Sequence, residues 1–246
     1  ALVASKLHIP VIHIEAGLRS FNKKMPEEIN RVMTDHVSSL LFAPTDIAIE
    51  NLKKESINDG VYQIGDVMYD AVLYNTEIAE KEHSLREFGL SSKDYILGTI
   101  HRAENTDDRE KMNAIVDAFI HLNKKVFLPL HPRTRKKLNE YQLLDKLKKA
   151  TNIILTEPIS YLEMLLLEKH ALAIVTDSGG VQKEAYFAKV PCFTLREETE
   201  WVETVDSGWN TLVNPLKENL TEIINACQAT DYKKNLYGDG KAGKKM

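Results

Sequence analysis

Residues 176–184, with the sequence TDSGGVQKE, combine the residue types that bind a nucleotide. Ser178, Gly179 and Gly180 follow a predicted buried strand and open a helix. Glycines let a ligand approach the backbone closely, and the free amides at a helix start suit a phosphate group. Glu184, one turn into the helix, could accept both hydroxyls of a ribose. The alternative is an ordinary tight turn between strand and helix, in which Ser178 only caps the helix.

His101 and Arg102 follow another apolar strand, residues 95–100. They therefore lie at the carboxyl edge of the predicted sheet, where open α/β sheets bind their ligands. A histidine and an arginine together suit a diphosphate. The alternative is a polar loop that carries a surface ion pair.

His131 stands in the equivalent place after the next strand, residues 125–130. A His-Pro turn explains it equally well. Arg133 and Arg135 are then part of a solvated basic run.

Glu15 and Glu27 are candidates for acid/base chemistry. His13 and Glu15 end the first strand, residues 10–14, and period-two alternation places them on one face. Pro26 starts a helix whose first turn holds Glu27. One interpretation is that Glu27 only matches the helix dipole. The other is that Glu15 and Glu27 are paired carboxylates, with the pKa of one raised by burial and by the charge of the other.

Metal chemistry has weak support in the sequence. His13-x-Glu15 matches half of a zinc deaminase signature, but there is no Cys-x-x-Cys. Cys192 and Cys227 lack the spacing of zinc ligands and provide no disulfide framework. The sequence therefore predicts no metal and no other cofactor, and a reduced cytoplasmic setting.

Short apolar runs alternate with longer amphipathic runs along the chain. The short runs are continuous, as expected of strands buried on both faces of a sheet. This alternation predicts the α/β class with doubly wound parallel sheets. The predicted strands are residues 10–14, 40–43, 61–64, 95–100, 125–130, 153–155, 172–176 and 192–195, and the predicted helices include 1–7, 27–38, 46–55, 109–123, 162–168 and 181–188.

Composition excludes several functions. The chain has 246 residues, of which 43% are hydrophobic and 28% charged, as in globular proteins with a core. Lys and Arg number 32 against 36 Asp and Glu, a formal net charge of −4. We therefore expect no nucleic-acid partner, because the basic footprint is missing. No apolar run reaches the ~20 residues of a membrane helix, and no signal peptide is visible, so we expect no membrane association.

The two ends indicate a longer parent sequence. The chain has no initiating Met, opens inside a predicted helix and stops at Met246 without a terminating element. The part before residue 65, where we place a domain boundary, is too short for a doubly wound domain. We therefore expect N-terminal sequence to be missing.

Taken together, the motifs resemble the non-hydrolysing UDP-N-acetylglucosamine 2-epimerase family. They occur in the family's order and span nearly the whole chain, which makes the combination specific. The matching motifs are HIEAGLR at 13–19, PEEINR at 26–31, HRAEN at 101–105, DSGGVQKE at 177–184, REETE at 196–200 and YGDG at 237–240.

The resemblance implies two facing Rossmann-like domains of the GT-B type, with the N-terminal one incomplete. Residues 1–65 would be the rest of that domain, 66–230 the UDP-binding domain, and 231–246 the start of a helix that returns to the N-terminal domain. The missing part would hold a catalytic Asp and basic UDP contacts. This chain alone is therefore expected to be inactive and prone to aggregate.

The implied reaction inverts C2 of a UDP-N-acetyl sugar. It converts UDP-N-acetylglucosamine to UDP-N-acetylmannosamine by elimination of UDP to a 2-acetamidoglucal and re-addition. The implied partners are the UDP-sugar substrate, a second UDP-sugar that activates the enzyme, and a second copy in a homodimer. Arg102 and His131 are the candidates to touch the activator.

The resemblance also carries residue roles. Glu15 and Glu27 match the acid/base carboxylates, and His101 matches the histidine beside the diphosphate and the reacting sugar, which makes these the candidate catalytic residues. Residues 178–180 match the phosphate cradle, Glu184 the ribose ligand, and two positions near Glu157-Pro158 the uracil pocket. The candidate substrate-binding residues are His101, Ile159, Met164, Ser178, Gly179, Gly180, Glu184 and Trp201.

Trp201 departs from the family pattern. Many members carry Arg-Pro-Glu where this chain has Trp201-Val202-Glu203. An indole can stack, but it cannot form the bidentate contact that a guanidinium makes with phosphate. The alternative substrate is therefore a UDP-diacetamido sugar or its uronic acid.

Two rival functions remain. A GT-B glycosyltransferase would share the fold and the nucleotide site, but it would need an acceptor cleft and no Glu15/Glu27 pair. A nucleotide-sugar-binding module would bind UDP without turnover.

Overall fold

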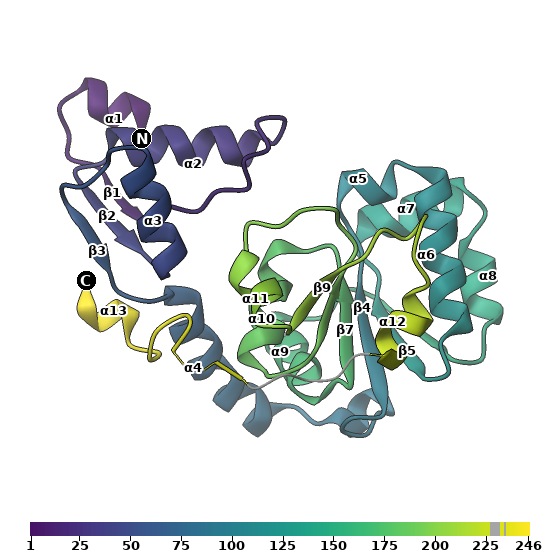
Figure 1. Cartoon of the computed structure of the whole chain (residues 1–246). Coiled ribbons are helices and arrows are strands. Elements are labelled where there is room, and N and C mark those ends of the chain that lie inside the picture. The colour runs from purple at the N-terminus through teal and green to yellow at the C-terminus, as the bar shows by residue number, and fades with distance from the viewer. Residues whose placement is uncertain (227–231, 234) are drawn as a thin grey trace. The chain divides into compact units, whose positions relative to one another are not determined.

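The computed structural model describes residues 1–226, 232–233 and 235–246. This part of the chain forms two compact units (Figure 1). The smaller unit comprises residues 1–74 and 233–246, and the larger unit residues 75–232. The division falls within helix α4 (Val67–Glu82), a little beyond the expected boundary after residue 65.

Six parallel strands form the sheet of the larger unit. They are β4 (Tyr95–Thr99), β5 (Lys125–Pro129), β6 (Ile153–Thr156), β7 (Ala173–Thr176), β8 (Cys192–Thr194) and β9 (Asn210–Leu212). Their spatial order is β6-β5-β4-β7-β8-β9, so the winding direction reverses between β4 and β7. This is the strand order of a Rossmann-like sheet, which binds ligands outside the carboxyl ends of the strands at the reversal.

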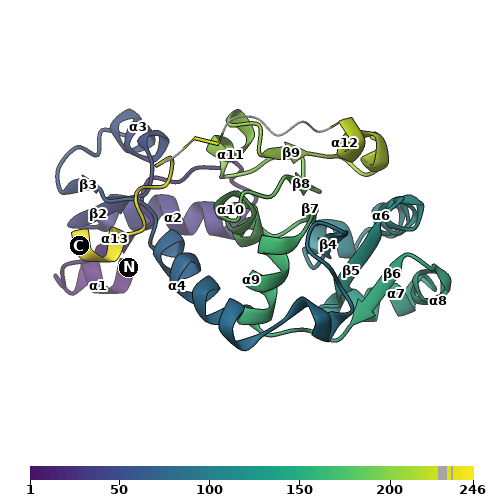
Figure 2. The ribbon, with the colours of Figure 1, turned by 90° about the horizontal axis from the view of Figure 1, so that it is seen from below.

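Helices cover both faces of this sheet, as Figures 1 and 2 show. One face carries α6 (Arg109–His121), α7 (Pro132–Glu140), α8 (Leu144–Lys149) and α12 (Leu220–Ala226), and the other face α9 (Tyr161–His170) and α10 (Gly179–Phe187). Helix α11 (Val202–Asp206) packs beside α10 and β9. The short helices η1 (Leu85–Phe88) and α5 (Ala103–Thr106) lie in connections.

Successive residues of the central strands point to opposite faces of the sheet and pack into two separate hydrophobic cores. Ile96 and Val126 belong to the core under α6, whereas Leu97 and Phe127 belong to the core under α9 and α10. All four side chains are at most 1% exposed. The prediction of strands buried on both faces is therefore confirmed for β4, β5, β7 and β8, whereas every residue of the edge strand β6 is only partly buried.

Sequence signals explain where two of the helices begin. The carboxylate of Asp108 accepts hydrogen bonds from the amides of Glu110 and Lys111 and starts α6. Ser160 and Glu163 form a reciprocal capping box that starts α9. Helix α9 therefore begins at a defined residue next to the sheet edge.

The smaller unit contains a three-stranded parallel sheet in the order β1-β2-β3. The strands are β1 (Ile12–Ile14), β2 (Leu40–Ala43) and β3 (Val61–Gln63), and the helices are α1 (Leu2–Lys6), α2 (Pro26–Val37), α3 (Asp46–Lys54) and α13 (Ala242–Lys245). Asp70 of α4 accepts the amides of Ala242 at 3.0 Å and Gly243 at 2.8 Å. These bonds tie the last residues of the chain to this unit.

The burial expected for the first strand is wrong. Ile12 is 56% exposed and Ile14 is 43% exposed, although Leu41 and Ala43 of the neighbouring strand are buried. The physical reason is that β1 is an edge strand of its sheet, and the described residues cover neither of its faces fully.

The predicted strands agree with the observed ones to within two residues at each end. Strand β9 was not predicted because Asn210-Thr211-Leu212 is short and mostly polar. Cys227 lies outside the described residues. No helix in the described ranges combines the length and the apolar character needed to cross a membrane.

Candidate functional site

The loops after β4 and β7 are bonded to each other where the strand order reverses. Asp177 ends β7 and is fully buried. Its carboxylate accepts the backbone amides of His101 and Arg102, each at 3.0 Å. The side-chain amide of Asn105 donates to the same carboxylate at 3.1 Å and to the carbonyl of Leu195 at 3.1 Å. The structure therefore brings together the two motifs that the sequence placed at one sheet edge.

His101 is partly exposed at this edge. Its Nδ1 lies 3.4 Å from an oxygen of Asp177, and its ring centroid lies 5.6 Å from that of His131. Burial lowers the pKa of His101, with smaller contributions from His131 and Arg102, while Asp177 opposes the shift. The imidazole is therefore neutral at neutral pH, a state that can take up a proton from a substrate or hydrogen-bond to it.

The basic run after β5 is used in structural contacts. His131 caps α7 by accepting the amide of Arg133 at 3.2 Å. Arg133 pairs with Asp107 at 2.5 Å, and Arg135 pairs with Glu157 at 2.6 Å. These contacts favour the interpretation of both arginines as surface residues.

The start of α10 is a confined candidate site for an anion. Ser178 is its N-cap residue, but its side chain makes no capping hydrogen bond, which corrects the expected cap. A Cβ on Gly179 would lie 3.0 Å from Glu200 Oε1 and 3.5 Å from Arg102 Nη2. A side chain larger than that of glycine would therefore force Glu200 to shift, whereas Arg102 would be in ordinary contact. The helix dipole, the amides of Gly179 and Gly180 and the Arg102 guanidinium favour an anion at this helix start, whereas the Glu200 carboxylate opposes one. Gly180 follows as the second residue of the helix and is partly buried.

Trp201 is packed against the same helix start and is 5% exposed. Lys183 Nζ lies 3.9 Å from the centre of its ring, which is cation–π geometry. The indole Nε1 is buried without a hydrogen-bond partner among the described residues and lies 3.7 Å from the Cβ position of Gly179. An unsatisfied buried donor costs about 1–3 kcal/mol, so this N–H is available to an acceptor atom of a ligand or a water.

A hydrogen-bond network fixes the loop of Trp201 onto α10. The Thr199 hydroxyl donates to Gln182 Oε1 at 2.6 Å, and the Asn210 side chain donates to the same oxygen at 3.0 Å. The amide of Trp201 donates to the Thr199 hydroxyl at 3.1 Å. The position of the indole is therefore set by α10 and β9 together.

Arg196 and Glu200 form a buried pair next to this network. Arg196 Nη1 donates to Glu200 Oε2 at 3.2 Å, whereas its Nε and Nη2 are buried without a partner in the described part of the chain. The pair sits at the carboxyl end of β8, and because its two charges offset each other it adds no net charge to this edge.

Glu184 lies in the second turn of α10 and is 6% exposed. Its carboxylate is hydrogen-bonded to the side chains of Tyr161 and Glu168, both on α9. Burial is the main cause that raises the pKa of Glu184. Burial raises the pKa of Glu168 further, and the charge of Glu184 adds to that shift. Two carboxyl groups can share a hydrogen bond only if one of them is protonated.

Ile159 and Met164 flank the start of α9. Both are partly buried and pack against the core that includes Val181 of α10. This places two apolar side chains beside the helix that carries Gly179 and Glu184.

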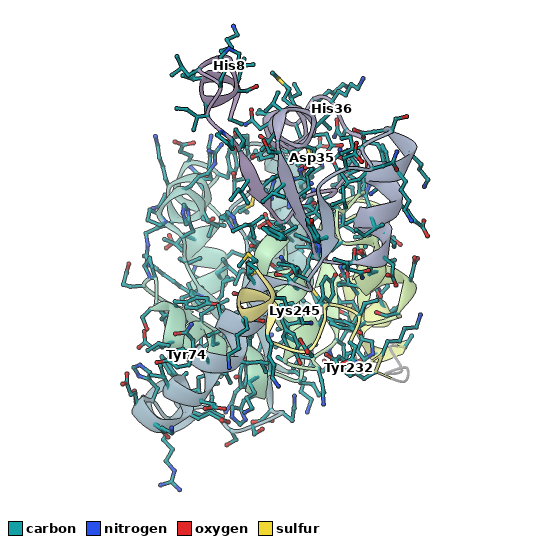
Figure 3. All side chains as sticks on the ribbon, turned by 90° about the vertical axis from the view of Figure 1, so that its left-hand side faces the viewer. His8, Asp35, His36, Tyr74, Tyr232 and Lys245 are labelled. Atoms are coloured by element: carbon teal, nitrogen blue, oxygen red, sulfur yellow. The ribbon has the colours of Figure 1, made fainter. Side chains whose placement is uncertain are left out.

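Asp35 organises the loop after β1 in the smaller unit. Its carboxylate receives His13 Nδ1 at 2.5 Å, the Gly17 amide at 3.1 Å and Arg19 Nη1 at 2.6 Å. Figure 3 labels Asp35 and its neighbour His36 near the end of α2, where Asp35 is buried and His36 exposed. Hydrogen bonds to the buried carboxylate of Asp35 therefore fix the loop between His13 and Arg19.

The chain turns sharply within this loop. Glu15 has a φ of +71° and Gly17 a φ of +83°. A Cβ on Gly17 would lie 2.3 Å from the carbonyl oxygen of Ala48. Since β1 ends at Ile14, period-two alternation does not extend to Glu15, which corrects the argument for a shared face with His13. A positive φ is uncommon for a residue such as Glu15, and strain of this kind clusters at functional sites.

The two acids at the start of α2 have different environments. Glu28 is 2% exposed and accepts the amides of Ser20 and Phe21, each at 2.9 Å. Glu27 is exposed. Glu28 thus holds the preceding loop, and Glu27 is the carboxylate that can meet a ligand.

Sequence reasoning assigned no role to Asp35 and Asp177, the buried carboxylates that hold the two candidate loops. The position of Asp177 could have been predicted, because an acidic residue directly after an apolar strand lies at the sheet edge. No sequence pattern distinguishes Asp35, which lies near the end of a helix.

A Rossmann-like unit whose polar loops meet at its strand reversal is typical of nucleotide-binding α/β proteins. The model of the family described as UDP-N-acetylglucosamine 2-epimerase matches residues 1–246. The chain therefore belongs to the UDP-N-acetylglucosamine 2-epimerase family, and its fold is of the GT-B type.

Individual relatives are similar over the whole chain. A UDP-N-acetylglucosamine 2-epimerase homolog of Methanococcus maripaludis is 53% identical over 252 residues, covering 100% of this chain and 70% of that protein. The UDP-2,3-diacetamido-2,3-dideoxy-D-glucuronate 2-epimerase of Pseudomonas aeruginosa is 44% identical, covering 100% and 69%. The crystal structure of the Methanocaldococcus jannaschii UDP-GlcNAc 2-epimerase in complex with UDP-GlcNAc and UDP has a TM-score of 0.90 at 49% identity, covering 99% and 69%.

Proposed function

We propose that the chain carries the UDP-sugar site of a non-hydrolysing UDP-N-acetylglucosamine 2-epimerase, an isomerase that produces UDP-N-acetylmannosamine. The observation that carries this proposal is the confined start of α10, where Gly179 lies against Arg102 and Trp201. The M. jannaschii relative, crystallised with UDP-GlcNAc and UDP, supports the same ligand class.

The larger unit offers a complementary group for each part of UDP. The amides of Gly179 and Gly180 and the hydroxyl of Ser178, at a helix start, suit the diphosphate, whereas the Ser178 amide already donates to Thr176 Oγ1 at 2.9 Å. Glu184 is the acceptor for ribose hydroxyls, because its carboxylate is already oriented by Tyr161. Ile159 and Met164 provide apolar contact for the uracil ring.

The reaction requires a base and an acid on opposite faces of C2. The base removes the C2 proton while the C1–O bond breaks, and UDP leaves with the bonding electron pair to give the 2-acetamidoglucal. UDP then adds back to C1 as an acid delivers a proton to the other face of C2. We assign these two roles to Glu15 and Glu27, and to neutral His101 the contact with the diphosphate and the reacting sugar.

The sugar itself has a second candidate. The P. aeruginosa relative is named for a diacetamido uronate, and Trp201 stands where many members carry an arginine. A UDP-diacetamido sugar or its uronic acid is therefore the alternative substrate. Comparison of kcat/KM for the two UDP-sugars separates them, since the true substrate should be favoured by a wide margin.

Incubation with UDP-N-acetylglucosamine in deuterium oxide tests the proposal. Epimerisation by proton transfer predicts deuterium at C2 of the recovered sugar nucleotides. Transfer of the sugar to an acceptor without deuterium at C2 would establish a glycosyltransferase. Binding of UDP without either outcome would establish a binding module.

The proposal includes regulation and assembly. Arg102 and His131 lie beside the proposed diphosphate site and are the candidate contacts to a second, activating UDP-sugar. Sigmoidal dependence of rate on UDP-N-acetylglucosamine would support the activator, and sedimentation would test the homodimer. A reduced cytoplasmic setting is consistent with Cys192, a buried free thiol whose pKa burial raises to about 12.

A further inference from the structure

Two buried carboxyl groups meet between α9 and α10. Glu168, near the end of α9, is 1% exposed, and Glu184 on α10 is 6% exposed. Their carboxyl groups lie within hydrogen-bonding range of each other. Neither oxygen of Glu168 accepts a hydrogen bond from an N–H or O–H group of the described residues. Such a contact between two carboxyl groups exists only with a proton between them.

The surroundings of Glu168 disfavour a negative charge there. The titratable groups that face it are Tyr161 on its own helix, Tyr95 on β4, Cys192 on β8 and Glu184 on α10. All of these are acids, and none can be a cation. The Tyr95 hydroxyl already donates to the carbonyl of Leu167 at 2.5 Å, so it does not serve Glu168.

The surroundings of Glu184 favour the charge on that side of the pair. Lys183, on the same helix, favours the ionised form of Glu184. The Tyr161 side chain is also hydrogen-bonded to Glu184. The charge therefore belongs on Glu184 and the proton on Glu168.

We propose that Glu168 is protonated at neutral pH and donates a hydrogen bond to Glu184, so that the buried pair carries one negative charge, on Glu184. Glu168 is then a positioning residue for the nucleotide site. It fixes the Glu184 carboxylate from the protein side and leaves lone pairs for the hydroxyls of a ligand. This last step rests on the proposed function, whereas the position of the proton does not.

The proton makes a testable contribution to stability. A carboxyl group whose pKa is raised by folding binds a proton in the folded state that the unfolded state has lost. Its contribution is complete below the unfolded pKa near 4.5 and is lost as pH rises through the folded pKa. Between pH 4.5 and the folded pKa, the folded-to-unfolded ratio of the wild type should therefore fall relative to that of Glu168→Gln, by up to about tenfold per pH unit.

Urea unfolding of the 246-residue chain between pH 5 and 8 tests this directly. Glu168→Gln keeps a neutral donor of the same size, so it should remove the pH-dependent difference and be more stable at pH 8. Glu163→Gln, a change of a partly exposed residue in the first turn of α9 where Gln can keep the cap, is the control and should keep the wild-type slope. Parallel pH profiles for the wild type and Glu168→Gln would overturn the assignment of the proton.

UDP titration by calorimetry tests the positioning role. Glu168→Gln should bind UDP within about twofold of the wild type, whereas Glu168→Leu, which has no donor, should bind about tenfold more weakly. Equal affinity in both variants would overturn the positioning role. If the wild type did not bind UDP, the proposed function would fail, but the unfolding experiment would still decide the position of the proton.

Discussion

The buried carboxylate of Asp177 accepts the backbone amide of His101 at 3.0 Å. This bond joins the end of one strand to the loop that follows its neighbour, at the point where the sheet reverses its winding. The bond holds His101 by its main chain, so the imidazole remains available for a substrate. At this edge of the sheet, Asp177 therefore positions the loop, and His101 is the residue whose side chain can contact a substrate.

Asp177→Asn should destabilise the larger unit and weaken UDP binding. Asn offers one acceptor oxygen where the carboxylate receives the amides of His101 and Arg102 and the side chain of Asn105. An unpaired buried donor costs about 1–3 kcal/mol, which urea unfolding would detect. Asp107→Asn, which breaks an exposed ion pair, is the control and should leave stability almost unchanged. Equal effects of the two variants would contradict the structural role of Asp177.

Gly179→Ala should reduce UDP affinity by about tenfold, since overpacking typically costs about 1–3 kcal/mol. The added Cβ would lie 3.0 Å from Glu200 Oε1 and would push that carboxylate toward the proposed anion site. Isothermal titration with UDP measures the change. Gly243→Ala, whose Cβ would meet Asp70 only at 3.5 Å, should leave UDP affinity unchanged. Unaltered UDP binding by Gly179→Ala would show that the diphosphate binds elsewhere.

Glu15→Gln and Glu27→Gln, made in the active enzyme, should each lower kcat by at least about 10²-fold with little change in UDP affinity, as expected for lost acid/base groups. Glu28→Gln should act differently. It weakens a buried acceptor of the Ser20 and Phe21 amides and should therefore lower stability as well. A near-normal kcat of Glu27→Gln would contradict the catalytic role. Glu27 would then only stabilise the start of α2 through its interaction with the helix dipole.

His101 should make stability depend on pH in the opposite direction from Glu168. Folding lowers its pKa below the ordinary histidine value of 6.5, so the unfolded state binds more protons in the range between the two values. The contribution is complete above pH 6.5 and is lost as pH falls through the folded pKa. His101→Asn should remove this slope below pH 6.5 in urea unfolding. His131→Asn should reduce the slope, because the charge of His131 helps to lower the pKa of His101.

The central strands of the larger unit were predictable because they are buried on both faces and therefore mostly apolar. The sequence also placed His101 and Ser178 correctly at the carboxyl edge, since an apolar run before a polar loop defines that edge. Strand β9 escaped prediction because its residues are polar. The cap of α10 was expected from Ser178, but the hydroxyl does not form it.

Other parts of the site depend on tertiary packing that no local pattern reports. The contact of Glu168 with Glu184 joins different helices, and the bonds of Asp35 to Gly17 and Arg19 span a loop and a helix. The left-handed φ of Glu15 is imposed by this loop rather than by its residue type. The sequence also cannot distinguish the roles of Glu27 and Glu28, because these depend on Glu28 being buried and Glu27 exposed.

The turn at Gly17 has a consequence for the gene. The Cβ position there is filled by the carbonyl oxygen of Ala48 at 2.3 Å, and the φ of +83° disfavours every other residue. Every missense change at a glycine codon adds at least a Cβ. The codon for Gly17 is therefore one at which only synonymous variation should persist, and a natural variant with another residue there should carry a compensating shift in the backbone around Ala48.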